Sequence, residues 1–589
     1  MYQKVSKSGT AIAVSILLAL TGCSSSGSSP TSSGTDGAAI AGGTLKVLAN
    51  GDVDHLDPQL IGYVPSNGVS RAVSRSLLSY VASDDAAVRG AVTGDLAAEV
   101  PTPSADGLTY ELKLRDGITW DAPDGARPIV AKDVARGIER ICTPYQGAAL
   151  GSYFIILIQG MDKYCKDFAG VAPTVEAMKA YIESNDISGI ETPDDTTVIF
   201  HLVEPSADFT SMLSLTVADP APVEVLDYLP DSPEYRANFI ASGPYKVGSY
   251  IPDSEWKFVR NPSWNADSDP LRKAYVDEIV MTMGLEGDAA MQQLEAGSAD
   301  MLFDIQPSAA NIARLTTAND TKFSTMENGG IEDFMWFNTK TTNNNSALQK
   351  LEVRQAIQYA IDKSAVQQIL GGESMATVVS GIFGPGINGY KQGSLYGDGS
   401  GKADPAKAKE LLAAAGVTNL TLKLPYINND ANPDIAQTIQ VSLEAVGIKV
   451  ELSPVPPTDY YSNFMTNPDN ATSGVWDIAI VGWNPDWPGD SARSVYQPQF
   501  TFNGTPQTYN YVDFNSDKAN ALASKARAAA TPAEAGLLWQ EVDKAVMEES
   551  PIVSIVSKKT ANYHSERIQN YLIYAMSQNG DWTNVWLKQ

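Results

Sequence analysis

An aromatic and acidic cluster follows a predicted buried strand in the C-terminal part of the chain. The strand covers 476–481 and leads into a loop with the sequence Gly482-Trp483-Asn484-Pro485-Asp486-Trp487-Pro488-Gly489-Asp490. Aromatic walls and one carboxylate suit the capture of an extended ligand that carries a positive amine, and a kinked backbone leaves amide groups available to pair with it. In the structural alternative, Trp483 and Trp487 are core aromatic residues and Asp486 caps a turn.

The sequence offers few components for a catalytic or metal site. Histidine occurs only at His55, His201 and His564, and neither an H-E-x-x-H nor a G-x-S-x-G motif is present. The sequence therefore lacks the residue patterns that a hydrolytic triad or a zinc site requires. The glycine-rich stretch 397–402 lacks the spacing of a phosphate-binding loop, and Ala403 stands where a hydroxyl residue is required, so we interpret it as a connecting loop. We expect no catalytic residue, no metal site and no cofactor.

The N-terminal residues predict export and anchoring. Two lysines precede an apolar run over 11–20, which is too short for a bilayer core that needs about 20 apolar residues. A small residue and Cys23 follow, and then a serine-rich stretch begins. We predict a lipoprotein signal peptide over 1–22, lipidation of Cys23 and a Ser/Gly-rich tether over 23–43. The alternative is a plain signal peptide that is cleaved elsewhere, with Cys23 incidental.

Composition predicts a globular body at the outer face of the cytoplasmic membrane. The chain has 589 residues, enough for two to four domains, and with 43% hydrophobic and 19% charged residues it can bury large cores. Removal of residues 1–22, which contain two lysines and no acid, changes the formal net charge from -27 to -29. Such an acidic surface repels nucleic acid and anionic lipid. We expect a soluble monomer beyond the anchor and no nucleic-acid partner.

Two cysteines remain after Cys23, and they are predicted to pair. Cys142 and Cys165 lie in a chain that we expect in an oxidising compartment, where disulfides form and persist. No C-x-x-C motif occurs, so we interpret the pair as a structural staple and not as a redox site.

Hydrophobic periodicity predicts mixed α/β structure along the body. In the first half we expect a strand over 45–49, a helix through Val69, Val73 and Leu77, a hairpin of 109–114 with 118–120, a helix over 131–141, and a strand pair around 193–195. In the second half we expect a helix from Val353 to the glycines at 371–372, a helix capped by Asp404, a βαβ unit over 421–452, and a helix that begins at a capping box over 531–534. No internal repeat is visible.

Six ordered blocks resemble one family of binding proteins. They are 43–45 with 56–58, the run Gly107 to Trp120 with 131–134, Ser242-Gly243-Pro244-Tyr245, Arg260-Asn261-Pro262, 353–357 with 360–362, and Gly482-Trp483-Asn484-Pro485-Asp486. With them, nearly all of the mature chain is similar to the extracellular solute-binding proteins of peptide-type ABC importers, family 5, which includes oligopeptide-, dipeptide- and nickel-binding proteins.

This resemblance implies an α/β fold of two lobes that close over a ligand by hinge motion, the large three-domain variant of the type II periplasmic-binding-protein clamshell. The first lobe would comprise residues 44–328 with a C-terminal return at 555–589, and the second would comprise 329–554. The protein would capture oligopeptides and deliver them to the permease and ATPase subunits of an ABC importer. Reversible binding would be its whole activity, so we expect no enzyme.

The resemblance also implies ligand-binding residues. Asp486 would hold the free α-amino group of a peptide, and the turn at Tyr63 and Val64 would add strand-like backbone hydrogen bonds. Arg493 is the candidate partner of the peptide carboxylate, and Tyr153, with Tyr145, would line the cleft. Further contacts would come from the same loop as Asp486, from Gly482, Trp483 and Asn484.

Other ligands remain open at this point. Members of the family that bind other solutes keep the same fold, and Pro485 and Trp487 make the loop stiffer than in some peptide binders. An oligosaccharide could stack on Trp483 and Trp487, with Asp486 bonding its hydroxyls. A secreted glycoside hydrolase would need two carboxylates such as Asp486 and Asp490 at a suitable separation. Nickel or haem capture is disfavoured because the histidines show no ligand grouping.

Overall fold

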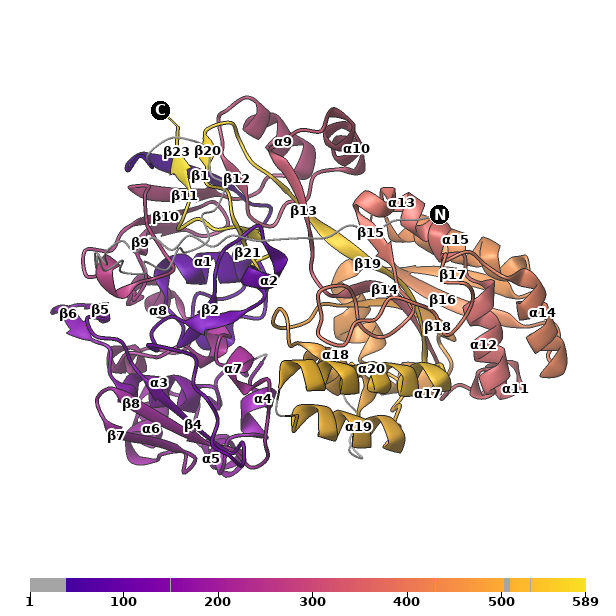
Figure 1. Ribbon diagram of the computed structural model, residues 1–589, viewed down its shortest axis with the longest axis horizontal. Coiled ribbons are helices and arrows are strands. Elements are labelled where there is room, and N and C mark those ends of the chain that lie inside the picture. The colour runs from indigo at the N-terminus through magenta and orange to yellow at the C-terminus, as the bar shows by residue number, and fades with distance from the viewer. Residues whose placement is uncertain (1–38, 149, 430, 503–508, 530, 589) are drawn as a thin grey trace, which may run out of the picture. The chain divides into compact units, whose positions relative to one another are not determined.

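The computed structural model describes residues 39–588, with the exception of 149, 430, 503–508 and 530 (Figure 1). The predicted signal peptide, the lipidation site Cys23 and most of the tether lie outside these residues. Within the described part of the chain, no helix has the length and apolar character that a membrane crossing requires.

A mixed sheet of five strands is built around the first strand of the body. Strand β1 pairs in parallel with β11 on one side and with β12 on the other. Leu45 and Val47 are fully buried and share a core with Trp256 and Ile279. In spatial order the strands are β12 (Met301–Leu302), β1 (Thr44–Leu48), β11 (Glu278–Thr282), β10 (Glu255–Arg260) and β9 (Tyr245–Ile251).

A smaller sheet with several helices forms a second unit in the first half of the chain. The predicted helix over 131–141 and the strand pair around 193–195 are confirmed. A disulfide joins Cys142, just after α3, to Cys165 in α5, with 4.7 Å between the Cα atoms. The elements of this unit are β4 (Thr109–Lys113), α3 (Ala131–Arg140), α5 (Met161–Phe168), α6 (Val175–Ser184), β7 (Ile190–Asp194) and β8 (Thr197–His201).

The hairpin predicted from 109–114 and 118–120 is wrong. Strand β4 pairs with β8, whereas the second segment forms β5 (Thr119–Ala122), which pairs with β6 (Gly125–Pro128). The turn between β5 and β6 contains Pro123 and Asp124 and is followed by Gly125 at φ 110°. Because this local turn already supplies a partner for β5, no pairing between β4 and β5 is needed.

Two predicted helices end earlier than their apolar spacing indicated. Helix α1 covers Ser66–Val73 and stops before Leu77. The single helix expected between 353 and 371 is two helices, α12 (Leu351–Ala360) and α13 (Lys363–Ile369). The break occurs because the carboxylate of Asp362 accepts the N–H of Ala365 at 3.0 Å and so begins a new helix.

The central sheet of the C-terminal half separates two hydrophobic cores. Successive residues of β14 (Ile331–Phe337) point to opposite faces, so Phe334 and Trp336 pack in one core while Met335 and Phe337 pack in the other. Helices α18 (Ala492–Phe500), α19 (Asp517–Arg527) and α20 (Pro532–Glu549) cover the first face, and α12, α14 (Pro405–Ala414) and α15 (Asn432–Glu444) contribute to the second core (Figure 1). The strand order is β13-β19-β14-β18, and β15 (Ala376–Val378) also pairs with β19.

The predicted βαβ unit is confirmed in the same half. Strands β16 (Thr421–Ile427) and β17 (Lys449–Val455) are parallel and in register, and α15 connects them. The capping box at 531–534 is also present in part, since the hydroxyl of Thr531 accepts the N–H of Glu534 at the start of α20.

Strand β19 (Ile552–Tyr563) connects the two halves. Its first residues, 552–556, pair with β14, and residues 559–563 pair with β13 (Phe323–Glu327). Beyond β19, the N–H of Ser565 donates to the carbonyl of Asp300 at 2.9 Å, and the C-terminal residues join the core around β1. We call residues 44–328 together with 564–588 the first lobe, and residues 329–556 the second lobe.

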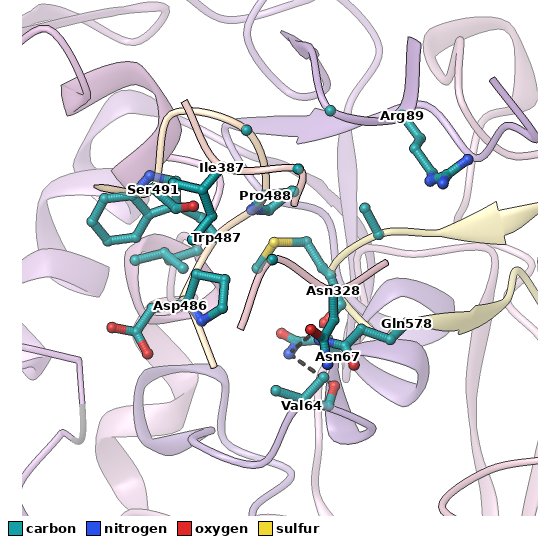
Figure 2. A pocket seen from close by; sticks show the side chains of 18 of the residues that line it. Val64, Asn67, Arg89, Asn328, Ile387, Asp486, Trp487, Pro488, Ser491 and Gln578 are labelled. Atoms are coloured by element: carbon teal, nitrogen blue, oxygen red, sulfur yellow. Dashed lines mark hydrogen bonds between the residues drawn. The ribbon is translucent and has the colours of Figure 1, made fainter. Parts of the chain in front are cut away.

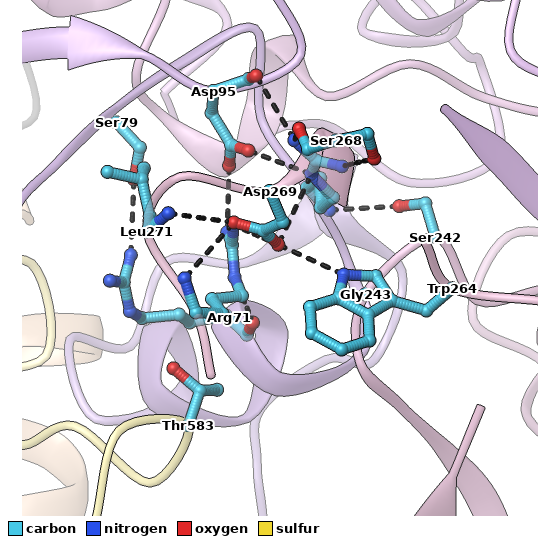
Figure 3. A network of polar contacts seen from close by, with 12 residues as sticks. Arg71, Ser79, Asp95, Ser242, Gly243, Trp264, Ser268, Asp269, Leu271 and Thr583 are labelled. Atoms are coloured by element: carbon cyan, nitrogen blue, oxygen red, sulfur yellow. Dashed lines mark hydrogen bonds and ion pairs between the residues drawn. The ribbon is translucent and has the colours of Figure 1, made fainter. Parts of the chain in front are cut away.

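A buried network of arginine and aspartate residues joins distant segments of the first lobe (Figure 3). Asp95 accepts hydrogen bonds from Arg75 and from Arg272, each at 2.8 Å. Arg272 also pairs with Asp269 at 3.2 Å. Each of these four side chains is at most 3% exposed. The network therefore fixes the segments after α1, after β3 (Val92–Gly94) and before β11 against one another.

We expect Asp95→Ala to destabilise the first lobe strongly. The change leaves two buried guanidinium groups without their shared carboxylate, and removal of one partner from a buried ion pair costs about 3 to 5 kcal/mol. The free energy of unfolding, measured by urea titration, should fall by this amount. The control is Asp167→Ala, which breaks the exposed pair with Lys163 and should cost less than about 1 kcal/mol. Equal losses for the two variants would contradict the expectation.

Candidate functional site

Two adjoining cavities meet at the loop that follows β18 (Ile478–Trp483). One has a volume of about 550 Å³, and we call it the aromatic cavity because Tyr461, Trp483, Tyr509 and Tyr511 line it. The other has a volume of about 260 Å³, and we call it the apolar cavity; among the residues that line it are Ile61, Leu150, Leu215, Met326, Ile387 and Met576 (Figure 2). Gly62, Val64, Pro485 and Asp486 line both cavities. Both lobes therefore contribute to one site.

The predicted strand over 476–481 extends to Trp483, and its last residue and the loop 484–490 are held in place by the start of α18. The indole N–H of Trp483 donates to the carbonyl of Ser494 at 2.9 Å, and the backbone N–H of Asp486 donates to the hydroxyl of Ser494 at 3.1 Å. Gly489 allows a close approach of the first lobe, because a Cβ atom there would lie 2.6 Å from the carbonyl oxygen of Gly90. The position of Asp486 is thus fixed by its own backbone.

Trp487 crosses from the second lobe into the core of the first. Its side chain is 1% exposed and belongs to the same hydrophobic cluster as Tyr153 and Leu213. The ring meets Tyr153 edge to face, with 5.1 Å between the centroids. The structural alternative is therefore correct for Trp487, which is a core aromatic residue. Its buried ring leaves too little exposed face for a sugar to stack on it.

Asp486 receives a hydrogen bond from the opposite lobe and has no positive partner in the described part of the chain. The hydroxyl of Tyr153 donates to Oδ2 of Asp486 at 2.5 Å. Among the described residues, no lysine, arginine or histidine nitrogen lies within 4.0 Å of this carboxylate. Burial raises the pKa of Asp486 to about 7, and the hydrogen bond from Tyr153 opposes this rise.

The other two acidic residues that line the cavities are compensated. In the aromatic cavity, Asp333 pairs with Lys558 at 3.0 Å. In the apolar cavity, Glu327 pairs with Lys559 at 3.2 Å. Asp486 is thus the carboxylate at which a positive ligand group would be matched.

The predicted residues of the loop itself face the aromatic cavity. Gly482, Trp483 and Asn484 all line it. The N–H of Gly482 is already used, because it donates to the hydroxyl of Tyr461 at 3.1 Å. Asn484 Oδ1 is buried and has no hydrogen-bond partner among the residues that the structure describes, which leaves it as a candidate acceptor for a ligand.

The turn at Tyr63 and Val64 was predicted to form backbone hydrogen bonds with a peptide, but only part of it lines the cavities. Val64 lines both cavities, whereas Tyr63 lines neither and its side chain is 40% exposed. The N–H groups of Gly62 and Tyr63 both donate to the carboxylate of Asp54, at 2.8 Å each. Sequence reasoning missed Gly62, which lines both cavities.

Three other predicted residues, Arg493, Tyr145 and Tyr153, line neither cavity, and one residue that was not predicted lines the apolar cavity. Arg493 is 1% exposed, lines neither cavity and donates to the hydroxyl of Ser206 at 3.0 Å. Tyr145 is 42% exposed and also lines neither. Arg89, at the end of α2 (Ala86–Arg89), lines the apolar cavity. Nothing in its sequence surroundings marks Arg89, because only the fold brings it there.

Comparison with known proteins identifies the family. Residues 91–494 match the model for bacterial extracellular solute-binding proteins, family 5 Middle. The chain belongs to this family. It is 24% identical over 491 residues to di/tripeptide-binding protein 4 of Pseudomonas aeruginosa, which covers 81% of this chain and 83% of that protein. It is 23% identical to heme-binding protein A of Haemophilus influenzae, over 80% of each chain.

A solved structure supports the fold. Clavulanic acid biosynthesis oligopeptide binding protein 2 superposes with a TM-score of 0.82 at 24% sequence identity, over 93% of this chain and 96% of that one. The predicted α/β, two-lobed type II fold is therefore confirmed. Family 5 proteins are extracytoplasmic binding proteins of importers, so this chain binds a solute and is not an enzyme. Among the described residues, no group of three or more histidine, cysteine or acidic side chains could hold a metal ion.

We expect the stability of the ligand-free protein to depend on pH through Asp486. Because burial raises the pKa of this carboxyl from 3.8 to about 7, the folded protein holds its proton more tightly than the unfolded chain, and stability falls as the pH rises between these values. In Asp486→Asn this contribution is absent. The melting temperature of the variant minus that of the wild type should therefore increase from pH 4 to pH 7 and then stay constant.

Tyr153→Phe serves as the companion variant for this measurement. It removes the hydrogen bond that lowers the pKa of Asp486, so the pH-dependent change should move to a higher pH. A difference between wild type and Asp486→Asn that does not vary with pH would contradict the expectation.

Proposed function

We propose that this protein is the lipid-anchored receptor of an ABC importer and that it captures oligopeptides through their free α-amino group. The observation that carries the proposal is the carboxylate of Asp486, which is partly buried where the two cavities meet and has no positive partner among the described residues. A peptide amine supplies the missing positive charge. A hydrogen bond between charged groups in such a place stabilises binding by about 1.5 to 3 kcal/mol.

The cavities on either side of Asp486 supply room for the rest of the ligand. Apolar side chains on one side and aromatic side chains on the other accept varied residues of a peptide without a requirement for one sequence. Asn484 Oδ1 adds an acceptor for a backbone N–H of the ligand. Tyr153 holds Asp486 until the amine arrives.

We propose Arg89, in place of Arg493, as the partner of the carboxylate of a short peptide. Its guanidinium donates to the backbone carbonyls of Ser83 at 3.5 Å and Asp84 at 2.8 Å, and no carboxylate of the described residues lies within 4.0 Å of it. Burial lowers its pKa, but an arginine stays charged. Figure 2 shows Arg89 and Asp486 on opposite sides of the apolar cavity, which gives a zwitterionic peptide one partner for each end.

The relatives and the N-terminal sequence support the remaining parts of the proposal. Relatives of this chain are named as peptide-binding proteins, among them the di/tripeptide-binding protein of Pseudomonas aeruginosa. Delivery to permease and ATPase subunits follows from the role of the family in importers. The sequence around Cys23 favours lipid attachment and a position at the outer face of the cytoplasmic membrane. We propose that the protein acts as a monomer.

An oligosaccharide is a weaker candidate ligand. Stacking on Trp487 is disfavoured by its burial, and a neutral sugar would leave the charge of Asp486 unmatched. Heme binding is the named property of one relative, which shows that membership of the family does not select the ligand. The charge balance of the site favours a peptide.

We expect Asp486→Asn to weaken the binding of peptides with a free N-terminus by about 10- to 150-fold, which corresponds to the loss of one charge-assisted hydrogen bond. Isothermal titration with a set of di- to pentapeptides measures this change. N-acetylation of the peptide should weaken binding to the wild type by a similar factor and should have little further effect on the variant.

The matched control for this experiment is Asp490→Asn. Asp490 lies in the same loop, lines neither cavity and accepts a hydrogen bond from Asn388 at 2.8 Å, so its substitution should leave affinity nearly unchanged. Full peptide affinity in Asp486→Asn would refute the amine assignment.

We expect Arg89→Gln to discriminate between peptide acids and peptide amides. For short peptides with a free carboxylate, affinity should fall by about tenfold or more, because a charged hydrogen bond is lost. The same peptides with an amidated C-terminus should bind both proteins equally. Arg314→Gln, at an exposed pair with Glu295, is the control. Equal losses for acid and amide would show that Arg89 does not contact the carboxylate.

A further inference from the structure

The two lobes also contact each other at a place that is separate from the cavities. The segment 204–208 of the first lobe connects β8 to α7 (Phe209–Met212), and two arginines of the second lobe, Arg493 and Arg527, contact it. None of these residues lines the apolar or the aromatic cavity. These residues therefore do not touch a ligand in either cavity, and we consider their effect on the position of one lobe against the other.

Arg493 forms the buried part of this contact. The side chain projects from α18, and its Nη1 donates to the hydroxyl of Ser206 at 3.0 Å and lies 3.4 Å from Oδ1 of Asp208. Arg493 is 1% exposed and Asp208 is 6% exposed, and the hydroxyl of Ser206 also donates to Asp208. Separation of the lobes would leave each charged group without the other. A buried pair of this kind is a means to specify one arrangement.

Arg527 forms the exposed part. Its backbone carbonyl accepts the N–H of Ala207 at 2.9 Å, and its Nη2 lies 3.2 Å from Oε1 of Glu204. The side chains of Arg527 and Glu204 are 21% and 48% exposed. Because this pair lies at the rim, its charges can be exchanged without disturbance of a core.

We propose that these contacts form a latch between the lobes that holds them together without the help of a ligand. The inference rests on the proposed function, because it concerns how that same site reaches its affinity. If only the closed arrangement binds peptide, the apparent dissociation constant is the intrinsic constant divided by the closed fraction. The latch raises this fraction and so strengthens the binding of every ligand by one common factor.

The test at the rim uses Arg527→Glu, Glu204→Arg and the double variant. Two peptides with different side chains are titrated into each protein. Each single variant should weaken both peptides by the same factor, about two- to fivefold as for a partly exposed ion pair, and the double variant should recover affinity. Lys163→Glu, at an exposed pair within the first lobe, should change nothing. A changed ratio between the two peptides, or no recovery in the double variant, would overturn the latch.

The buried part is tested with Arg493→Met. Affinity for both peptides should fall by about tenfold or more, because Asp208 keeps a buried charge without its partner. The radius of gyration of the ligand-free protein, measured by small-angle X-ray scattering, should increase, while circular dichroism shows unchanged secondary structure. An unchanged radius and unchanged affinity would refute the latch. If this variant does not fold, the charge-exchange variants of Arg527 and Glu204 test the latch.

The scattering measurement also separates this inference from the proposed function. If the wild-type protein binds no peptide, the proposed function fails, but the latch still predicts a larger radius for Arg527→Glu and for Glu204→Arg and a restored radius for the double variant. If peptides bind and the radius and affinity are the same in all variants, the latch fails while the proposed function stands.

Discussion

The insertion of Trp487 into the core of the first lobe is the contact on which the geometry of the site depends. The residue belongs to the second lobe, yet its ring is packed beside Tyr153 and is almost fully buried. Burial of an aromatic side chain of this size contributes several kcal/mol, so it strongly stabilises this position of the loop. Asp486 precedes Trp487 in the chain, and it is consequently held where both cavities and both lobes meet. This apolar contact, together with the hydrogen bonds to Ser494, thus positions the carboxylate that we propose as the partner of a ligand amine.

The same arrangement makes Asp486 an unfavourable residue in the absence of a ligand. Within the described residues, this partly buried carboxylate has a tyrosine hydroxyl as its hydrogen-bond partner, and it loses hydration without gaining an opposite charge, which is why its pKa rises to about 7. The nearby pairs Asp333–Lys558 and Glu327–Lys559 show that the fold supplies counter-charges to other acidic residues of the cavities. The unmatched carboxylate is therefore a local feature of this position, and a ligand amine can relieve it. In the proposed function, a peptide amine gains affinity because its binding removes this cost of burying the Asp486 carboxylate.

Local patterns predicted the elements that carry the site but not the contacts between them. The buried strand before Gly482, the loop with Asp486 and the βαβ unit around α15 were all recognisable, because each is specified by residues that are close in sequence. The false hairpin at 109–120 shows the limit, since alternation indicates strands but does not say which strand pairs with which. The environments of Arg493 and Arg89 could not be predicted from the sequence for the same reason. One points into the opposite lobe and the other into a cavity, and only the tertiary fold decides between these environments.

We assign different roles in ligand binding to the two kinds of contact between the lobes. In the proposed function, contacts at the cavities, from Asp486, Asn484 and the aromatic wall, depend on the chemistry of the ligand and therefore select among ligands. Contacts at the segment 204–208 involve protein groups alone, so in the proposed latch they set a baseline on which each ligand builds. A receptor with broad selectivity needs such a baseline, because a site that makes few specific contacts to side chains gains little affinity from any one of them. The buried pair of Arg493 with Asp208 supplies part of it through the protein alone, and the ligand is left to contribute only its amine, its backbone and whatever its side chains add.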